Sequence, residues 1–143
     1  MSQRIVVDSS VVVKWFVREE PESSAARLLL SRFEKGECEL IVPDLLFYEV
    51  GNVFLMKWSD DLKRLQGAFL HLWELPWLIT PLRKSLLVRV LEIATQFHLT
   101  FYDALFVGTA EQADALFVTA DEKMARRTTP LPFVRELGSF LPE

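Results

Sequence analysis

Cysteine and histidine are nearly absent from this sequence of 143 residues. Cys38 is the only cysteine, so no disulfide can form within the chain, as is typical of proteins in a reducing cytoplasm. The two histidines, His71 and His98, lie far apart and form no Cys/His cluster of the kind that binds zinc. These absences exclude an internal disulfide framework and argue against a zinc site.

Long apolar runs and a surplus of positive charge are absent as well. No run approaches the roughly 18 residues that a membrane span needs, and the opening segment MSQRIVVDSS has no apolar core of a signal peptide. We therefore expect a cytoplasmic protein. The chain carries 20 acidic and 16 basic residues and a net charge of −4, which does not indicate a strongly basic nucleic-acid binder.

The chain does contain enough apolar residues to build a core. Half of the residues are apolar and 12% are aromatic, which argues against disorder. The length suits one compact domain, and we expect residues 1–143 to form it.

Strands and helices are predicted to alternate along the chain. Short apolar runs rich in β-branched residues predict strands at 4–8, 39–43, 77–82, 115–121 and 132–138. Longer periodic segments predict helices at 9–20, 21–37, 43–58, 59–73, 84–99, 101–114 and 122–127. This alternation predicts an α/β fold with three α/β/α layers around a parallel sheet of four to five strands. Ligands of such sheets bind at the carboxyl ends of the strands.

Several carboxylates lie at sequence positions that the predicted fold would bring together at the carboxyl edge of the sheet. Asp8 and Asp121 each end a predicted strand, and Asp103 lies in the first turn of the predicted helix 101–114. Each has a purely structural alternative. Asp8 and Asp121 could cap the helices that follow, and Thr100 with Asp103 fits a relaxed capping box.

Glu49 is harder to explain as an ordinary residue on the solvent-exposed side of a helix. It lies inside a predicted helix that is apolar on nearly every side, so we expect that helix to be largely buried. Asn52 follows three residues later and shares a side with Glu49. A buried carboxylate needs a partner, because an unpaired buried charge is very costly.

Four acids at one sheet edge would repel one another, and a divalent cation would remove that conflict. Hard oxygen ligands favour Mg²⁺ or Mn²⁺. Without these four acids the chain would have 16 acidic and 16 basic residues, so with metal bound it would repel a polyanion less than its net charge suggests.

Several segments together resemble the PIN-domain family, and most closely its VapC-type toxin ribonucleases of type II toxin–antitoxin systems. The segments are VDSSVVVKWF, YEVGNVF and FYDALFVGTAEQADALFVTADEKMA, and the resemblance runs from the first predicted strand to about Arg127. It implies that the catalytic, metal-binding acids are Asp8, Glu49, Asp103 and Asp121. Supporting positions match Ser9, Ser10, Asn52 and Thr119.

The resemblance also implies an activity: Mg²⁺- or Mn²⁺-dependent hydrolysis of RNA phosphodiester bonds by a cytoplasmic endoribonuclease, with tRNA and rRNA as candidate targets. It implies a VapB-like antitoxin as partner. The many large apolar residues of the predicted helices 43–58 and 59–73, with Trp77, favour a homodimer, a higher oligomer or an antitoxin contact, and packing into the core alone is the alternative. Cations near the predicted acids could bind RNA phosphates, although an ordinary solvated face is the alternative. They are Lys14, Arg18, Lys123, Arg126 and Arg127.

Three other functions compete with a toxin ribonuclease. A stand-alone PIN nuclease could act on structured RNA or DNA without an antitoxin. A PIN module without catalysis could bind a metal or a partner, although the presence of all four acids argues against it. A phosphatase with an aspartate nucleophile would usually have a second aspartate two residues after the first, where this chain has Ser10.

Overall fold

The described residues form one parallel sheet of five strands in the order β3-β2-β1-β4-β5. The structure is a computed structural model, and it describes residues 2–17 and 21–139. The strands are β1 (Gln3–Val7), β2 (Cys38–Pro43), β3 (Leu78–Thr80), β4 (Leu116–Thr119) and β5 (Val134–Glu136). The expected parallel sheet of four to five strands is confirmed.

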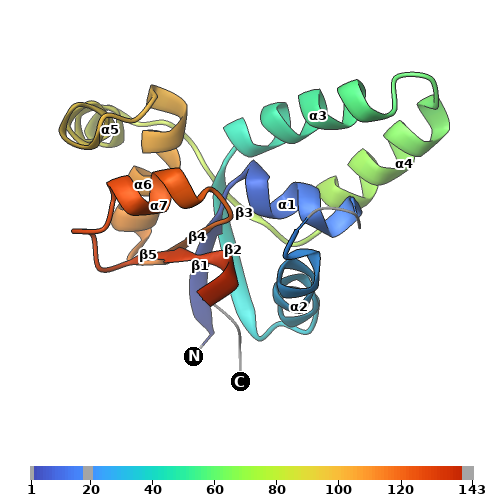
Figure 1. The fold of residues 1–143 in the computed structure, drawn as a ribbon, viewed down its shortest axis with the longest axis horizontal. Coiled ribbons are helices and arrows are strands. Elements are labelled where there is room, and N and C mark those ends of the chain that lie inside the picture. The colour runs from blue at the N-terminus through green and yellow to red at the C-terminus, as the bar shows by residue number, and fades with distance from the viewer. Residues whose placement is uncertain (1, 18–20, 140–143) are drawn as a thin grey trace.

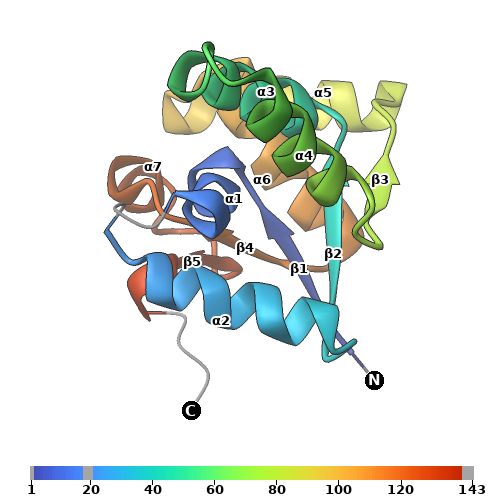
Figure 2. The same cartoon turned by 90° about the vertical axis from the view of Figure 1, so that its right-hand side faces the viewer.

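Helices cover both faces of this sheet, which confirms the three-layer prediction. They are α1 (Ser9–Phe16), α2 (Ser23–Glu34), α3 (Leu45–Lys57), α4 (Leu62–Trp73), α5 (Lys84–Phe97), α6 (Phe101–Ala113) and α7 (Glu122–Arg127). Helix α6 packs against β1, β2 and β4 with α5 beside it, and Figure 1 shows α1 and α2 on the opposite side of the sheet. Helices α3 and α4 form a hairpin next to α1 (Figure 2).

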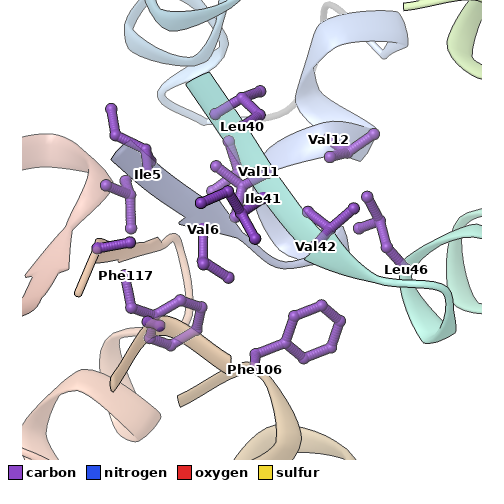
Figure 3. Packing of buried hydrophobic residues seen from close by; sticks show 14 of the residues in the cluster. Ile5, Val6, Val11, Val12, Leu40, Ile41, Val42, Leu46, Phe106 and Phe117 are labelled. Atoms are coloured by element: carbon purple, nitrogen blue, oxygen red, sulfur yellow. The ribbon is translucent and has the colours of Figure 1, made fainter. Parts of the chain in front are cut away.

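The core lies on the two inner strands and the helices that cover them. In β1, Ile5, Val6 and Val7 are fully buried, as a strand covered on both faces requires. Side chains from β1, β2, α1, α3 and α6 gather around them (Figure 3). The rings of Phe106 and Phe117 stack with centroids 6.4 Å apart and join α6 to β4.

Six of the seven predicted helices are longer than the observed ones, three of them by more than two residues at one end. The first ends at Phe16 because Val17 is extended, and predicted positions 18–20 lie outside the described residues. The second begins at Ser23 rather than at 21, because Glu22 adopts the left-handed conformation. The fourth begins at Leu62 rather than at 59, because the side chain of Asp61 caps it by accepting from the backbone N–H of Arg64 (3.1 Å).

The expectation that α3 is largely buried is wrong. Leu46, Phe47, Val50 and Phe54 are buried, but the far side of the helix exposes large apolar groups. Met56 is 76% exposed. The reason is that α3 packs on α1 and β2 with one side, while the α3–α4 hairpin leaves the other side open. No helix of the described residues is long and apolar enough to cross a membrane.

Candidate active site at the carboxyl edge of the sheet

The order in which strands are added to the sheet reverses at β1. Strands β2 and β3 lie on one side of β1, whereas β4 and β5 lie on the other. Such a switch point leaves a crevice at the carboxyl ends of the two strands, where open α/β sheets bind ligands. Asp8 directly follows β1, and Asp121 follows β4 by two residues, so topology places both acids at this crevice.

Asp8 is the most deeply placed of the four acids. It is 6% exposed, and its Oδ2 accepts a hydrogen bond from Thr119 Oγ1 at 2.6 Å. Its Oδ1 accepts from the Ser10 hydroxyl. Asp8 stands at the N-cap position of α1 but makes no capping bond with its side chain, so the helix-cap alternative does not explain this residue.

The pKa of Asp8 reflects this burial. It is raised to about 6, mainly by loss of solvation; the hydrogen bonds from Ser10 and Thr119 lower it in part, and the negative charges of Asp103 and Glu49 add to the rise. A carboxylate that is hard to ionise alone would be ionised readily beside a bound cation.

Glu49 approaches the same region from α3. It is half-buried, and its Oε1 accepts a hydrogen bond from Ser9 Oγ at 3.1 Å. Burial raises the pKa of Glu49, and the charge of Asp103 raises it further. Ser9 and Ser10 therefore connect the first turn of α1 to two different acids. The structure does not bring Asn52 into these contacts: it is exposed, and its amide lies 4.0 Å from the sulfur of Met56.

Asp103 lies half-buried in the first turn of α6. Its backbone N–H donates to Thr100 Oγ1 at 3.1 Å, which confirms that Thr100 caps this helix. Burial raises the pKa of Asp103 and the charge of Asp121 raises it further, whereas a hydrogen bond with the Thr100 side chain and the charge of Arg127 lower it.

Asp121 is exposed and does serve as a helix cap. Its Oδ1 accepts from the backbone N–H of Met124 at 3.0 Å at the start of α7. Its own N–H donates to Thr119 Oγ1 at 3.0 Å. Thr119 is fully buried and so links Asp121 to Asp8 through one hydroxyl.

The four acids thus influence one another in a chain from Asp121 through Asp103 to Asp8 and Glu49. Every candidate ligand is a hard oxygen donor, which fits Mg²⁺ or Mn²⁺. Among the residues that the structure describes, no three acidic, histidine or cysteine side chains already lie close enough to hold one ion together. The donor chemistry fits a hard divalent cation, which one or two carboxylates can hold while water fills the remaining positions.

The predicted cations lie in two different settings. Lys123, Arg126 and Arg127 are exposed on α7, where the guanidinium of Arg127 donates to the carbonyl of His98 at 2.8 Å. Lys14 is 8% exposed. Arg18 lies outside the described residues.

A further cation, Lys57, was missed by the sequence analysis. It lies at the end of α3 and lines a cleft of about 320 Å³ together with Lys14. Glu49, Val53 and Lys57 follow one another at intervals of four residues, which places them on one side of α3. That spacing was visible in the sequence and could have indicated Lys57.

Fold and site together define an α/β protein with an acidic crevice at the switch point of a parallel sheet. The sequence model of the PIN domain matches residues 5–129, and the chain belongs to the PIN-domain family. This confirms the family predicted from the sequence. No curated protein matches the chain at a significant level of sequence similarity.

Solved structures share the fold at low sequence identity. A protein of Pyrobaculum aerophilum is 22% identical with a TM-score of 0.62, covering 97% of this chain and 94% of its own. A toxin–antitoxin complex from Klebsiella pneumoniae is 16% identical with a TM-score of 0.66, covering 93% and 97%. VapC20 of Mycobacterium tuberculosis, a toxin that cleaves the sarcin–ricin loop, is 11% identical with a TM-score of 0.66, covering 85% and 93%.

Proposed function

We propose that this protein is a metal-dependent endoribonuclease, the toxin of a VapBC-type toxin–antitoxin pair, formed by residues 1–143 as a single domain. The observation that carries the proposal is Asp8: a carboxylate 6% exposed, held by two hydroxyls, whose pKa is raised to about 6 beside other acids. Perturbed acids clustered in a crevice are typical of active sites. Membership of the PIN-domain family supports a nuclease.

Each acid has a role in this proposal. Asp8 and Asp103 bind Mg²⁺ or Mn²⁺ directly, Glu49 completes the site from α3, and the exposed Asp121 acts through water. The bound metal supplies polarisation of the scissile phosphate and a lower pKa for the attacking water. Ser9, Ser10 and Thr119 orient the carboxylates through hydroxyl bonds that the structure contains. Asn52 would support Glu49 only after changing its side-chain conformation.

Substrate and partners follow from the surroundings of the site. Lys14, Lys123, Arg126 and Arg127 are proposed to bind RNA phosphates, and Arg127 is near enough to lower the pKa of Asp103. The similar toxin that cleaves the sarcin–ricin loop supports rRNA, beside tRNA, as a candidate target. The similar toxin–antitoxin complexes support a VapB-like antitoxin, and the exposed apolar side of α3 and α4 gives it or a second copy a surface to cover.

Cleavage of cellular RNA by the purified protein tests the proposal. We expect the wild type to produce discrete fragments with Mg²⁺ or Mn²⁺, and EDTA to abolish them. Asp8→Asn and Asp103→Asn should each lower the rate by at least about a hundredfold, because loss of one charged ligand weakens the whole metal site. The matched control is Asp114→Asn, since Asp114 is exposed in a left-handed conformation that asparagine tolerates.

Equal cleavage by Asp8→Asn and by the wild type would show that a contaminating nuclease is responsible. No cleavage by the wild type would favour the binding module. Cleavage of structured DNA as readily as RNA, with no antitoxin gene beside this one, would favour the stand-alone nuclease.

A further inference from the structure

Beside the acidic crevice lies a cleft of about 320 Å³ whose walls come from three parts of the chain. Ser10 and Lys14 line it from α1, Val53 and Lys57 line it from α3, and Ala120 closes it after β4. Helix α1 lies beneath α3 in both views of the molecule, which places the two helical walls against each other (Figures 1 and 2).

The wall from α1 connects the cleft to the most buried acid. Ser10 and Lys14 are four residues apart and therefore share a side of the helix. The hydroxyl of Ser10 donates to Asp8 and accepts from the backbone N–H of Ala120 at 2.9 Å, so one residue belongs to the acidic crevice and to the cleft. Lys14 is only 8% exposed, although it lines an open space. The aliphatic stem of a lysine packs readily against apolar groups while its ammonium reaches an open space, so Lys14 can present its charge to an anion in the cleft.

The wall from α3 repeats this arrangement. Glu49, Val53 and Lys57 lie at intervals of four residues, so one side of α3 carries an acid, then an apolar group, then a cation. The eight residues from Glu49 to Lys57 span roughly 12 Å along the helix axis. A strand with one phosphate at the acids would therefore continue along α3 toward the second lysine.

We propose that this cleft binds the nucleotide next to the scissile phosphate of a single-stranded RNA. Lys14 and Lys57 hold its backbone phosphate, while Val13, Val53 and Ala120 contact the sugar and base. If the acids hold the metal at the reacting phosphate, cations further along the same side of α3 are placed to hold the neighbouring one and so to position the strand. The assignment deepens the proposed nuclease function and rests on it for the identity of the substrate. Contact through phosphates positions a strand without reading its sequence.

Binding of a fluorescently labelled, short single-stranded RNA in EDTA tests this assignment without any hydrolysis. We expect Lys57→Gln to weaken binding several-fold and to reduce the slope of log affinity against log salt by about 0.7, the value for one phosphate contact on a single strand. Lys57→Arg should keep the salt slope because it keeps the charge. Lys35→Gln is the matched control, since Lys35 is exposed where α2 ends, at the amino end of the sheet.

The double variant Lys14→Gln/Lys57→Gln should weaken binding further than the single variant does, because both cations that hold the phosphate are lost. Circular dichroism shows whether the double variant folds. If it does not, the single variant Lys57→Gln carries the test, because Lys57 is exposed and its replacement should not disturb folding. Unchanged affinity and slope for Lys57→Gln, or no RNA binding by the wild type, would overturn the assignment. A wild type that binds RNA with this lysine dependence but never cuts it with Mg²⁺ or Mn²⁺ would contradict the nuclease proposal alone.

Discussion

Thr119 Oγ1 donates a hydrogen bond of 2.6 Å to Asp8 Oδ2 across 111 residues of sequence. Both residues are buried, and β1 and β4 are paired strands. The bond therefore links the segments that follow these two strands at the switch point of the sheet. The same hydroxyl accepts from the N–H of Asp121 at 3.0 Å. One threonine therefore fixes the carboxylate at the end of β1 relative to the chain that leaves β4.

Replacement of this threonine tests how much the bond matters. Thr119→Val keeps the shape of the side chain but leaves Asp8 Oδ2 and the N–H of Asp121 without this partner. We expect the free energy of unfolding to fall by about 1–3 kcal/mol, the cost of unsatisfied buried polar groups. Because loss of the hydroxyl also removes an effect that lowers the pKa of Asp8, that pKa should rise further. Urea unfolding and titration by NMR measure the two changes.

Thr109→Val provides the matched control for Thr119→Val. Thr109 is equally buried, but its hydroxyl donates to the carbonyl of Leu105 within its own helix. It should therefore lose little stability, because that carbonyl also belongs to the helix ladder. Equal effects of the two substitutions, with no change at Asp8, would show that the bond from Thr119 has no special role in orienting the acid.

The stability of the metal-free protein should fall as the pH rises. The pKa of Asp8 is about 6 in the folded protein and 3.8 without the surrounding fold, so between these values the folded state binds more protons than the unfolded state. Stability contributed in this way is greatest at low pH and is lost as the pH rises through 6. Burial raises the pKa of Glu49 and of Asp103 in the same direction.

Comparison with Asp8→Asn isolates the contribution of Asp8 to the pH dependence of stability. In EDTA, the free energy of unfolding of the wild type should drop relative to Asp8→Asn by roughly 1 kcal/mol between pH 5 and pH 7. Urea titrations of both proteins at the two pH values give this difference, in which titratable groups distant from Asp8 cancel. A wild type that gains stability over the variant across this range would mean that Asp8 is ionised without difficulty, contrary to its buried position.

The packing of α5 on α6 depends on a glycine. A Cβ at Gly108 would come within 2.9 Å of Val90 Cγ2 and 3.3 Å of Leu86 Cδ1. Gly108→Ala should therefore destabilise the protein by about 1–2 kcal/mol, because overpacking outweighs the roughly 1 kcal/mol that alanine gains in a helix. The additional substitution Val90→Ala opens space for the new methyl group and should lessen the conflict. Thermal unfolding of the single and double variants measures both effects.

Gly67→Ala is the control for that helix propensity. Gly67 lies in α4 with no atom within 4 Å of the added methyl group, so alanine should stabilise the protein by about 0.5–1 kcal/mol. If Gly108→Ala stabilises the protein as much as Gly67→Ala does, α5 and α6 do not approach as closely as described.

The sequence was sufficient to place two acids at one edge of the sheet, but not to fix the strand ends, since β1 ends at Val7 and β4 at Thr119, or the contacts between the strands. Asp8 and Asp121 could be placed at one edge because parallel strands all end on the same side of a sheet. The family resemblance indicated Thr119 as a supporting residue, but its bond to Asp8 in particular could not be foreseen, since strand order is decided by packing over the whole chain. For helix α3 the sequence predicted more burial than the structure has. An apolar sequence does not distinguish a buried helix from one with an apolar exposed side, as the exposed Met56 shows.

Asp121 combines two roles that one pair of substitutions separates. Its side chain caps α7, and asparagine caps a helix about as well as aspartate does. Asp121→Asn should keep the free energy of unfolding within about 0.5 kcal/mol, while Asp121→Ala should lose about 1 kcal/mol. Asp61→Ala, which removes the cap of α4 far from the acids in sequence, should lose a similar amount and serves as the control.

Metal affinity then reveals the second role of Asp121. If its charge helps to hold the cation through water, Asp121→Asn and Asp121→Ala should weaken Mn²⁺ binding equally, by about tenfold, whereas Asp61→Ala should leave it unchanged. Isothermal titration with Mn²⁺ measures all three. Should Asp121→Asn bind Mn²⁺ as tightly as the wild type does, Asp121 is a helix cap alone, and the metal would depend on Asp8, Asp103 and Glu49.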